Sequence, residues 1–294
     1  MSVQYQTVKV KRILKKEDKG SWFNCNYVVS PYTGCEYDCI YCLGCMGIEE
    51  PKEFPGIIQV KINAPGILKK ELKSKRKGIL CLVGYQAIEK EHMIIRKILE
   101  VINARRFPVH IITKSDIVLD DLDIISKISE NSWCAISFCI NTMDERISSI
   151  FEPKAPSPKK RIQALEKVAE AGVVTGVAPM SIIPYITDSE PGLEDVISSA
   201  AKAKASYILP ISLTLEDNCR VEFINVIKRH FPKLLIKYRR LYEFGSAPDV
   251  RYSKRLRNRI VFLLNKYGIS GIIPEYPQKE EKIQVNIENF LSKR

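Results

Sequence analysis

The chain has 294 residues, of which 45% are hydrophobic and 27% are charged. This composition is ordinary for a globular protein, and no stretch approaches the roughly 20 apolar residues that are needed to cross a bilayer. Lys and Arg number 46 against 34 Asp and Glu, which gives a formal net charge of +12. The amino terminus lacks the apolar core of a secretory signal, so we predict a cytoplasmic protein with no membrane partner. In that compartment the nine cysteines are expected to serve metal binding, catalysis or burial more than disulfides.

The chain divides into three predicted parts. Residues 1–24 predict an arm, in which valines alternate with lysine and threonine. Residues 25–235 predict the main domain, in which apolar strands alternate with helices. The strands are expected at 26–30, 79–83, 108–113, 132–140, 173–183 and 206–213, and the helices between them at 89–105, 120–129, 144–151, 158–171, 191–203 and 215–230. This alternation predicts parallel strands joined by right-handed crossovers, but periodicity alone does not distinguish an open sheet from a barrel.

Residues 236–294 predict a small, basic, helix-rich extension. The segment 250–267 has the pattern of an amphipathic helix with arginines on its outer face. Between Lys228 and Lys266 there are twelve basic residues and two acidic ones, which is the charge pattern of a protein that binds a polyanion. We therefore predict contacts to nucleic acid from Arg239, Arg240, Arg251, Arg255 and Arg259. An ordinary solvated surface is the alternative.

Three cysteines, Cys35, Cys39 and Cys42, fall within eight residues with the spacing C-x3-C-x2-C. Thiolates this close can converge on one inorganic centre, and soft sulfur ligands select iron–sulfur clusters, zinc or copper(I). A [4Fe–4S] cluster held by three cysteines leaves one iron open for chemistry. Two alternatives are open on spacing alone: one buried helix face, and a zinc site that Cys45 completes as the fourth thiolate.

The cysteine loop resembles that of the radical S-adenosylmethionine (radical SAM) enzymes, with the aromatic Tyr41 directly before the third cysteine. Three further segments resemble the spore photoproduct lyase family, namely Thr113-Lys114-Ser115, Phe151-Glu152-Pro153-Lys154-Ala155-Pro156-Ser157-Pro158 and Ile182-Ile183-Pro184. The resemblance runs from residue 27 to about residue 188, a little over half of the chain. It implies an α/β fold of the radical SAM type, a partial (β/α)6 TIM-like barrel with its site at the carboxyl ends of the strands.

The resemblance also implies cofactors and a reaction. Cys35, Cys39 and Cys42 would ligate a [4Fe–4S] cluster, and S-adenosylmethionine would bind the fourth iron. Lys114 would pair with the carboxylate of that cofactor, and Asn141 would lie beside it. An external one-electron reductant would supply the electron that cleaves the cofactor to a 5′-deoxyadenosyl radical. In spore photoproduct lyase the target is a thymine dimer in DNA, flipped out of the stack.

Two catalytic residues are implied by the same resemblance, and some family residues are missing. Cys81 aligns with the hydrogen donor of the lyase, with an ordinary core cysteine as the alternative, and Tyr41 with part of its tyrosine relay. The tyrosine that usually follows the third cysteine is Leu43 here. In the segment 82–89 Tyr85, Gln86 and Glu89 match the family, but the acidic residue that the family carries before the tyrosine is missing. A radical SAM enzyme that modifies tRNA or protein is therefore an alternative to DNA repair. A zinc-stabilised nucleic-acid-binding protein without catalysis is another.

Overall fold

A seven-stranded sheet forms the centre of the computed structural model, which describes residues 3–17, 23, 25–42 and 56–276. The strand order is β11-β9-β8-β7-β6-β3-β2. The parallel strands are β3 (Tyr27–Val29), β6 (Leu80–Val83), β7 (Val109–Thr113), β8 (Cys134–Cys139), β9 (Val174–Ala178) and β11 (Tyr207–Ile208). The edge strand β2 (Leu14–Lys16) runs antiparallel to β3. The six predicted strands and their parallel pairing are thus confirmed.

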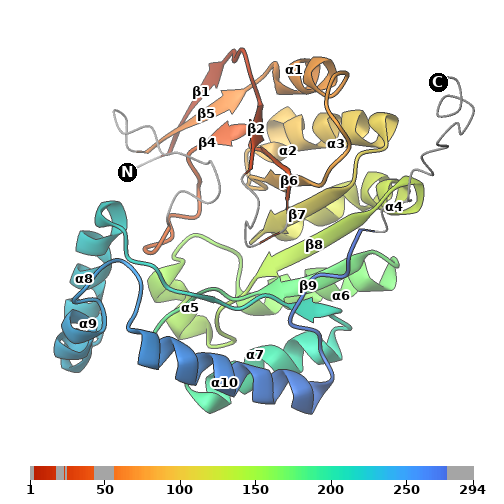
Figure 1. The fold of residues 1–294 in the computed structure, drawn as a ribbon. Helices are drawn as coiled ribbons and strands as arrows, with labels where there is room; N and C mark the ends of the chain where they lie inside the picture. The colour runs from red at the N-terminus through yellow and green to blue at the C-terminus, as the bar shows by residue number, and fades with distance from the viewer. Residues whose placement is uncertain (1–2, 18–22, 24, 43–55, 277–294) are drawn as a thin grey trace, which may run out of the picture.

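Helices follow each parallel strand, so that a β/α unit occurs six times (Figure 1). They are α1 (Ala64–Glu71), α2 (Glu89–His92), α3 (Ile94–Arg105), α4 (Leu122–Asn131), α5 (Glu145–Phe151), α6 (Pro158–Glu170), α7 (Glu190–Lys202) and α8 (Asp217–His230), followed by α9 (Leu235–Leu241) and α10 (Val250–Tyr267). Two short 3-10 helices lie at Asp116–Asp121 and Pro232–Leu234. Among the described residues, no helix is long and apolar enough to span a membrane.

One predicted helix, 89–105, is divided in two at Met93, where φ is 49°. The Glu89 side chain accepts hydrogen bonds from the backbone N–H groups of Ile95 (2.8 Å) and Arg96 (3.3 Å). Because the first N–H groups of a helix have no partner within it, this carboxylate starts a new helix at Ile94. The periodicity of the sequence continues across the break and does not reveal it.

Two predicted strands are also divided, each near a proline. The region 173–183 forms β9 and then β10 (Met180–Ile182), on either side of Pro179. The region 206–213 forms β11 and then β12 (Ile211–Ser212), on either side of Pro210. Proline has no N–H group for the ladder, and β10 and β12 pair with each other in a separate two-stranded sheet.

Both ends of the described chain pack on the main sheet or beside it. Strand β1 (Gln4–Val8) runs parallel to β5 (Ile57–Lys61), which pairs with β4 (Tyr32–Thr33) next to the cysteine loop. Helix α10 packs against α7, where Lys266 Nζ lies 2.5 Å from Glu194 Oε1. The division into arm, barrel and extension stays a prediction.

The inner face of the sheet is filled in layers by side chains from neighbouring strands. Cys81 is in register with His110, and two residues further Val83 is in register with Ile112. All four side chains are buried. Lys114 follows Ile112 by two residues and lies at the carboxyl end of β7. The layer of Val83 and Ile112 therefore forms the floor of any site that is built by the turns at the carboxyl ends of the strands.

Candidate active site at the carboxyl ends of the strands

Cys35, Cys39 and Cys42 line one pocket, together with Lys114 from the end of β7 and Cys139 from the end of β8. The pocket lies where the resemblance predicts a site. The turn into the loop depends on Gly34, whose φ is 85° and where a Cβ atom would lie 3.0 Å from the carbonyl oxygen of Ile57. Only glycine takes this conformation at no steric cost, so Gly34 sets the direction in which the loop leaves β4.

The cysteine loop is tied to the turn that follows β6. The Glu36 carboxylate accepts hydrogen bonds from the backbone N–H groups of Ala87 (2.7 Å) and Ile88 (3.0 Å), and from the hydroxyl of Tyr5 (2.9 Å). In return, the backbone N–H of Glu36 donates to Gln86 Oε1 at 2.9 Å. Bonds to an ionised acceptor are stronger than neutral ones, so Glu36 fixes the loop before any ligand binds.

A buried group of polar side chains stands behind the pocket, centred on Glu152. The Glu152 carboxylate lies 2.6 Å from Arg161 Nη1 and 3.8 Å from Lys114 Nζ, and it accepts a hydrogen bond from the Tyr41 hydroxyl. That hydroxyl in turn accepts from Asn141 Nδ2 at 3.0 Å. The structure thus brings Tyr41, Lys114 and Asn141 together around Glu152, and their roles toward a cofactor stay a prediction. Glu152 belongs to the matched segment 151–158, in which the sequence assigned it no role, and Arg161 follows that segment by three residues.

The pKa shifts of the pocket follow from burial. Burial raises the pKa of Cys35 to about 11 and raises that of Cys39, and the charge of Lys114 opposes both shifts. Burial alone would lower the pKa of Lys114, but attraction to Tyr41, Cys39, Cys139 and Glu152 outweighs it and the net shift is upward. Thiolates are therefore costly in this pocket unless further positive charge is added. A metal centre supplies such charge.

The three thiols share a pocket without converging on one point. Within the part of the chain that the structure describes, no group of three or more His, Cys, Asp or Glu side chains is placed to hold a single metal ion. Ligands to different irons of a cluster need not converge, whereas ligands to one zinc ion must. Three thiols at this spacing are the ligand type that a [4Fe–4S] cluster takes. Cys45, the fourth thiolate of the zinc alternative, lies outside the described residues.

Cys81 lies one layer below the pocket. Val83 and Ile112 line the pocket floor, and Cys81 does not line it. Its thiol shares a hydrogen bond with Cys25, which lowers the pKa of Cys25 to about 6 and raises that of Cys81. A direct hydrogen donor has to reach the substrate, so the role of Cys81 stays a prediction that depends on movement of this floor.

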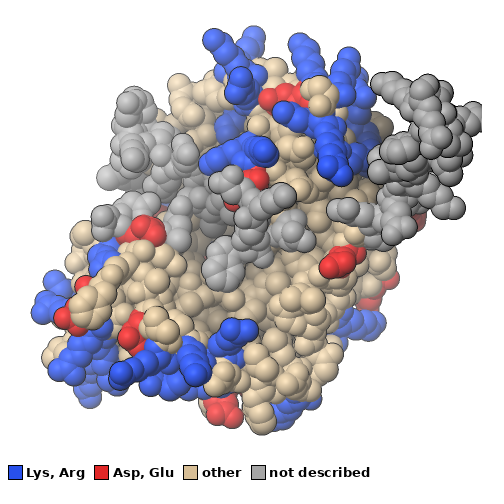
Figure 2. Space-filling model, viewed as in Figure 1, with Lys and Arg blue, Asp and Glu red and all other residues tan. Residues whose placement is uncertain are grey.

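The arginines predicted to bind nucleic acid lie on α9 and α10. Arg251, Arg255 and Arg259 are spaced four residues apart on α10 and therefore share one face, while Arg239 and Arg240 lie in the last turn of α9. Figure 2 shows basic side chains in two groups, one over α1 and one over α8, α9 and the start of α10. Arg255 and Arg259 line a common pocket.

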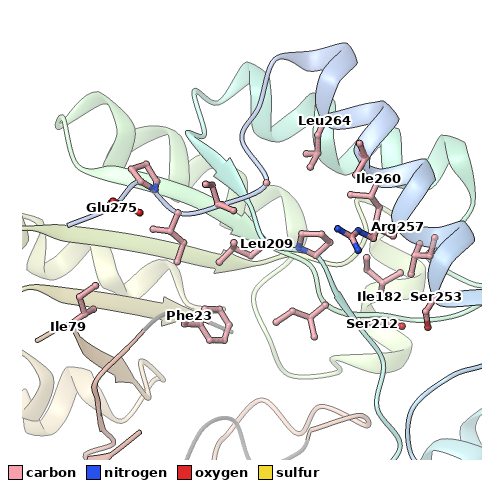
Figure 3. A pocket seen from close by; sticks show the side chains of 18 of the residues that line it. Phe23, Ile79, Ile182, Leu209, Ser212, Ser253, Arg257, Ile260, Leu264 and Glu275 are labelled. Atoms are coloured by element: carbon pink, nitrogen blue, oxygen red, sulfur yellow. The ribbon is translucent and has the colours of Figure 1, made fainter. Parts of the chain in front are cut away.

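A separate cleft of about 770 Å³ lies between β12, α10 and residues 271–276 (Figure 3). Its walls are mostly apolar, as at Trp133, Leu209 and Ile260, and Arg257 enters from α10. No cysteine of the loop lines it. Because its lining comes from positions between 23 and 276, no local sequence signal predicts this cleft.

Comparisons with known proteins agree with this fold. No family model matches the chain. An uncharacterized protein of Mycobacterium tuberculosis is 25% identical over 98% of this chain and 88% of its own length. A double mutant of spore photoproduct lyase with bound AdoMet and dinucleoside spore photoproduct has a TM-score of 0.66, with 18% identity, over 90% of this chain and 78% of the lyase. SuiB of Streptococcus suis bound to S-adenosylmethionine has a TM-score of 0.56, with 11% identity, over 81% of this chain and 47% of SuiB.

The chain therefore has the partial-barrel fold of the radical SAM enzymes. Within that fold it is similar to spore photoproduct lyase over nine-tenths of its length, and the predicted fold class is confirmed.

Proposed function

We propose that this chain is a radical SAM enzyme that acts on nucleic acid, with DNA carrying a photoproduct as the first substrate to test. One observation carries the proposal. Three cysteines and a buried lysine share a pocket at the carboxyl ends of the strands, in a fold whose solved example holds both AdoMet and a dinucleoside photoproduct.

In this proposal Cys35, Cys39 and Cys42 hold a [4Fe–4S] cluster, and S-adenosylmethionine binds at its remaining iron. When bound and reduced by an external donor, the two groups supply the hydrogen-abstracting chemistry of the reaction. Lys114 is buried and lies above the Tyr41 ring, with Nζ 5.6 Å from the ring centroid. Its compact ammonium suits a carboxylate partner.

Tyr41 and Asn141 act as positioning residues in this proposal. The Tyr41 hydroxyl donates to Glu152 and accepts from Asn141, so the residue between two cluster ligands is fixed at its hydroxyl. Asn141 also donates to the carbonyl of Ser181 at 3.4 Å, which connects the segment after β8 to β10 of the separate two-stranded sheet. Together these bonds fix Tyr41 and Asn141 behind the pocket.

The basic surface supports a nucleic-acid substrate. Lys and Arg over α1 and over α8 to α10 lie at two ends of the same face (Figure 2). Phosphate contacts of this kind contribute affinity that falls as salt is added. In a damaged strand that is held by this surface, the photoproduct would react after it is flipped out of the stack.

Anaerobic reconstitution tests the proposal. Protein loaded with iron and sulfide is expected to turn brown with about four irons per chain, and to form 5′-deoxyadenosine when dithionite and S-adenosylmethionine are added. Ultraviolet-damaged DNA should stimulate this formation and undamaged DNA should not. Cys39→Ala is the matched control and should lose both iron and activity. Colourless protein holding one zinc per chain would contradict the proposal, and activity without stimulation by damaged DNA would contradict only the substrate.

The hydrogen-donor role of Cys81 needs its own test. Cys81→Ala is expected to lower the yield of repaired dimer while 5′-deoxyadenosine forms within about twofold of the wild-type rate, since cofactor cleavage precedes hydrogen return. Cys134→Ala removes another buried thiol of the sheet and should change neither quantity. Wild-type repair by a folded Cys81→Ala protein would rule the role out.

A further inference from the structure

We infer that the pocket between the 185–188 turn and α10 binds a phosphate of a nucleic-acid strand, with Tyr185 as the stacking surface for an adjoining base. The inference rests on the proposed function and names where that substrate is held. The pocket has a volume of about 190 Å³ and is lined by Tyr185, Asp188, Tyr252, Arg255, Leu256 and Arg259.

Arg255 is the main cation of this pocket. It is exposed on α10, and among the described residues no carboxylate forms an ion pair with it. Arg259 is half-buried and donates to the carbonyl oxygen of Asp188. Lys237 approaches from α9, with Nζ 5.4 Å from the centroid of the Tyr185 ring. Two arginines thus line one small pocket, and Lys237 lies over the Tyr185 ring that forms part of its wall.

Asp188, which lines this pocket, and Asp249, at the start of α10, are already engaged. Asp188 Oδ2 accepts a hydrogen bond from the Tyr252 hydroxyl at 2.7 Å. Asp249 Oδ1 accepts from the backbone N–H groups of Arg251 (2.8 Å) and Tyr252 (3.2 Å) at the start of α10. Because cations outnumber these two carboxylates, an anion gains from entering the pocket. A guanidinium offers a forked set of donors that matches phosphate geometry.

Tyr185 is held in an unusual conformation and remains partly exposed. Its φ is 63°, which is uncommon for an aromatic residue, and 39% of its surface is accessible. The preceding carbonyl, Pro184 O, accepts from the Tyr238 hydroxyl at 2.5 Å, and the ring packs against the edges of Tyr238 and Tyr252. Such local strain persists only where the surroundings enforce it. An aromatic ring fixed beside cations is the arrangement that stacks single-stranded bases.

The same short segment reaches the cysteine pocket. Met180 lines the pocket of Cys35, Cys39 and Cys42, and Tyr185, five residues later, lines the phosphate pocket. Five residues span at most about 18 Å when fully extended. That distance corresponds to roughly five nucleotides at the axial rise of one DNA strand. A strand anchored at Tyr185 and Arg255 can therefore present a nearby base to the proposed active site.

Fluorescence anisotropy with a labelled single-stranded oligonucleotide tests the inference on the full-length chain. Arg255→Gln is expected to weaken binding roughly 5- to 10-fold and to lower the slope of log K against log salt by about one. Tyr185→Leu should weaken binding at least about fivefold. Arg257→Gln removes the same charge from the same helix but faces the large cleft, so it should change affinity less than about twofold.

Equal losses in Arg255→Gln and Arg257→Gln would overturn the inference, because they would mean diffuse electrostatics. The inference would also be overturned if Arg255→Gln bound the strand as tightly as the wild type does while inorganic phosphate still protected the wild type against thermal unfolding. That pair of results would assign the pocket to free phosphate. Thermal melting of each variant shows whether it is folded, and retention of Arg257→Gln binding controls for general damage. Formation of 5′-deoxyadenosine without DNA should be the same in Arg257→Gln as in the wild type. If the wild-type chain forms none, the proposed function fails while the binding result stands.

Discussion

Glu152 and Arg161 form an ion pair of 2.6 Å in which neither side chain has exposed surface. Arg161 also donates to the carbonyl oxygens of Pro156 (2.7 Å) and Cys139 (2.8 Å). The pair therefore joins the start of α6 to the end of β8, directly behind the cysteine pocket. Burying such a pair costs desolvation energy that only good geometry and further hydrogen bonds offset. Arg161 Nε and Nη1 make such bonds, whereas Nη2 is buried without a hydrogen-bond partner among the described residues.

Glu152→Gln is expected to destabilise the fold by roughly 3–5 kcal/mol, because it leaves Arg161 and Lys114 as buried cations without their carboxylate. Urea unfolding monitored by circular dichroism measures the change. Glu166→Gln makes the same substitution at an exposed position of α6 and should stay within about 0.5 kcal/mol of the wild type. Equal stability of the two variants would mean that the ion pair contributes nothing.

Lys114→Met should weaken the binding of S-adenosylmethionine by about 10- to 100-fold, since hydrogen bonds to charged groups contribute about 1.5–3 kcal/mol. Equilibrium dialysis of the reconstituted protein measures the affinity, and absorbance of the cluster shows that iron is still held. Lys167→Met changes an exposed lysine of α6 and should bind the cofactor normally. Loss of the cluster itself in Lys114→Met would assign the lysine to the metal centre in place of the cofactor.

The strands and the cysteine loop could be predicted because their signals are local. Buried parallel strands are short apolar runs, such as Leu80–Val83, and need no knowledge of the partner strand. The loop cysteines lie within eight residues. By contrast, Tyr41 and Glu152 are hydrogen-bonded across 111 positions of sequence. No spacing within one segment encodes such a pair, and only the resemblance drew attention to the segment that holds Glu152.

Some local breaks were missed because a side chain decides them. The Glu89 carboxylate bonds to backbone N–H groups six and seven residues further on and thereby separates α2 from α3. On periodicity, an acidic residue at this position fits the first turn of one continuous helix equally well. The contact between Glu89 and the Tyr32 hydroxyl depends on how the barrel and the loop are arranged in space. A local sequence pattern does not predict that arrangement.

Glu89 gives the fold a defined pH dependence. Burial raises its pKa to about 6 from an ordinary value of 4.5, although the Tyr32 hydroxyl and the N–H groups of Arg96 and Ile95 act in the opposite direction. The folded chain therefore binds this proton more tightly than the unfolded chain. The stabilising contribution is complete below pH 4.5 and is lost as the pH rises to about 6.

We expect the wild type to lose on the order of 2 kcal/mol of unfolding free energy relative to Glu89→Gln between these two pH values. The variant lacks the titrating group, so the difference between the two proteins isolates it. Urea titrations at several pH values across the window provide the measurement. Glu100→Gln changes an exposed residue of α3, and its unfolding free energy should vary with pH in the same way as that of the wild type. If the unfolding free energy of the wild type rose with pH relative to that of Glu89→Gln, the sign would be opposite to the expected one, and the raised pKa of Glu89 would be contradicted.

Gly176 lets strand β11 close against β9 at one edge of the barrel sheet. A Cβ atom there would lie 2.5 Å from ring atoms and from the carbonyl oxygen of Tyr207. The Tyr207 hydroxyl is 2.9 Å from Ser137 Oγ, which is 2.8 Å from His110 Nε2. Gly176→Ala must therefore displace a buried ring and its polar contacts, and overpacking of this kind costs about 1–3 kcal/mol.

Gly66→Ala is the matched control, because nothing lies within 4 Å of a Cβ atom at this exposed position of α1. It should stabilise the chain by up to about 1 kcal/mol, since alanine favours helix. Thermal unfolding of the two variants should thus shift in opposite directions from the wild type. If Gly176→Ala unfolded at the same temperature as the wild type, the sheet edge at β11 would be loose enough to repack. The close contact between Gly176 and Tyr207 would then not limit the stability of the fold.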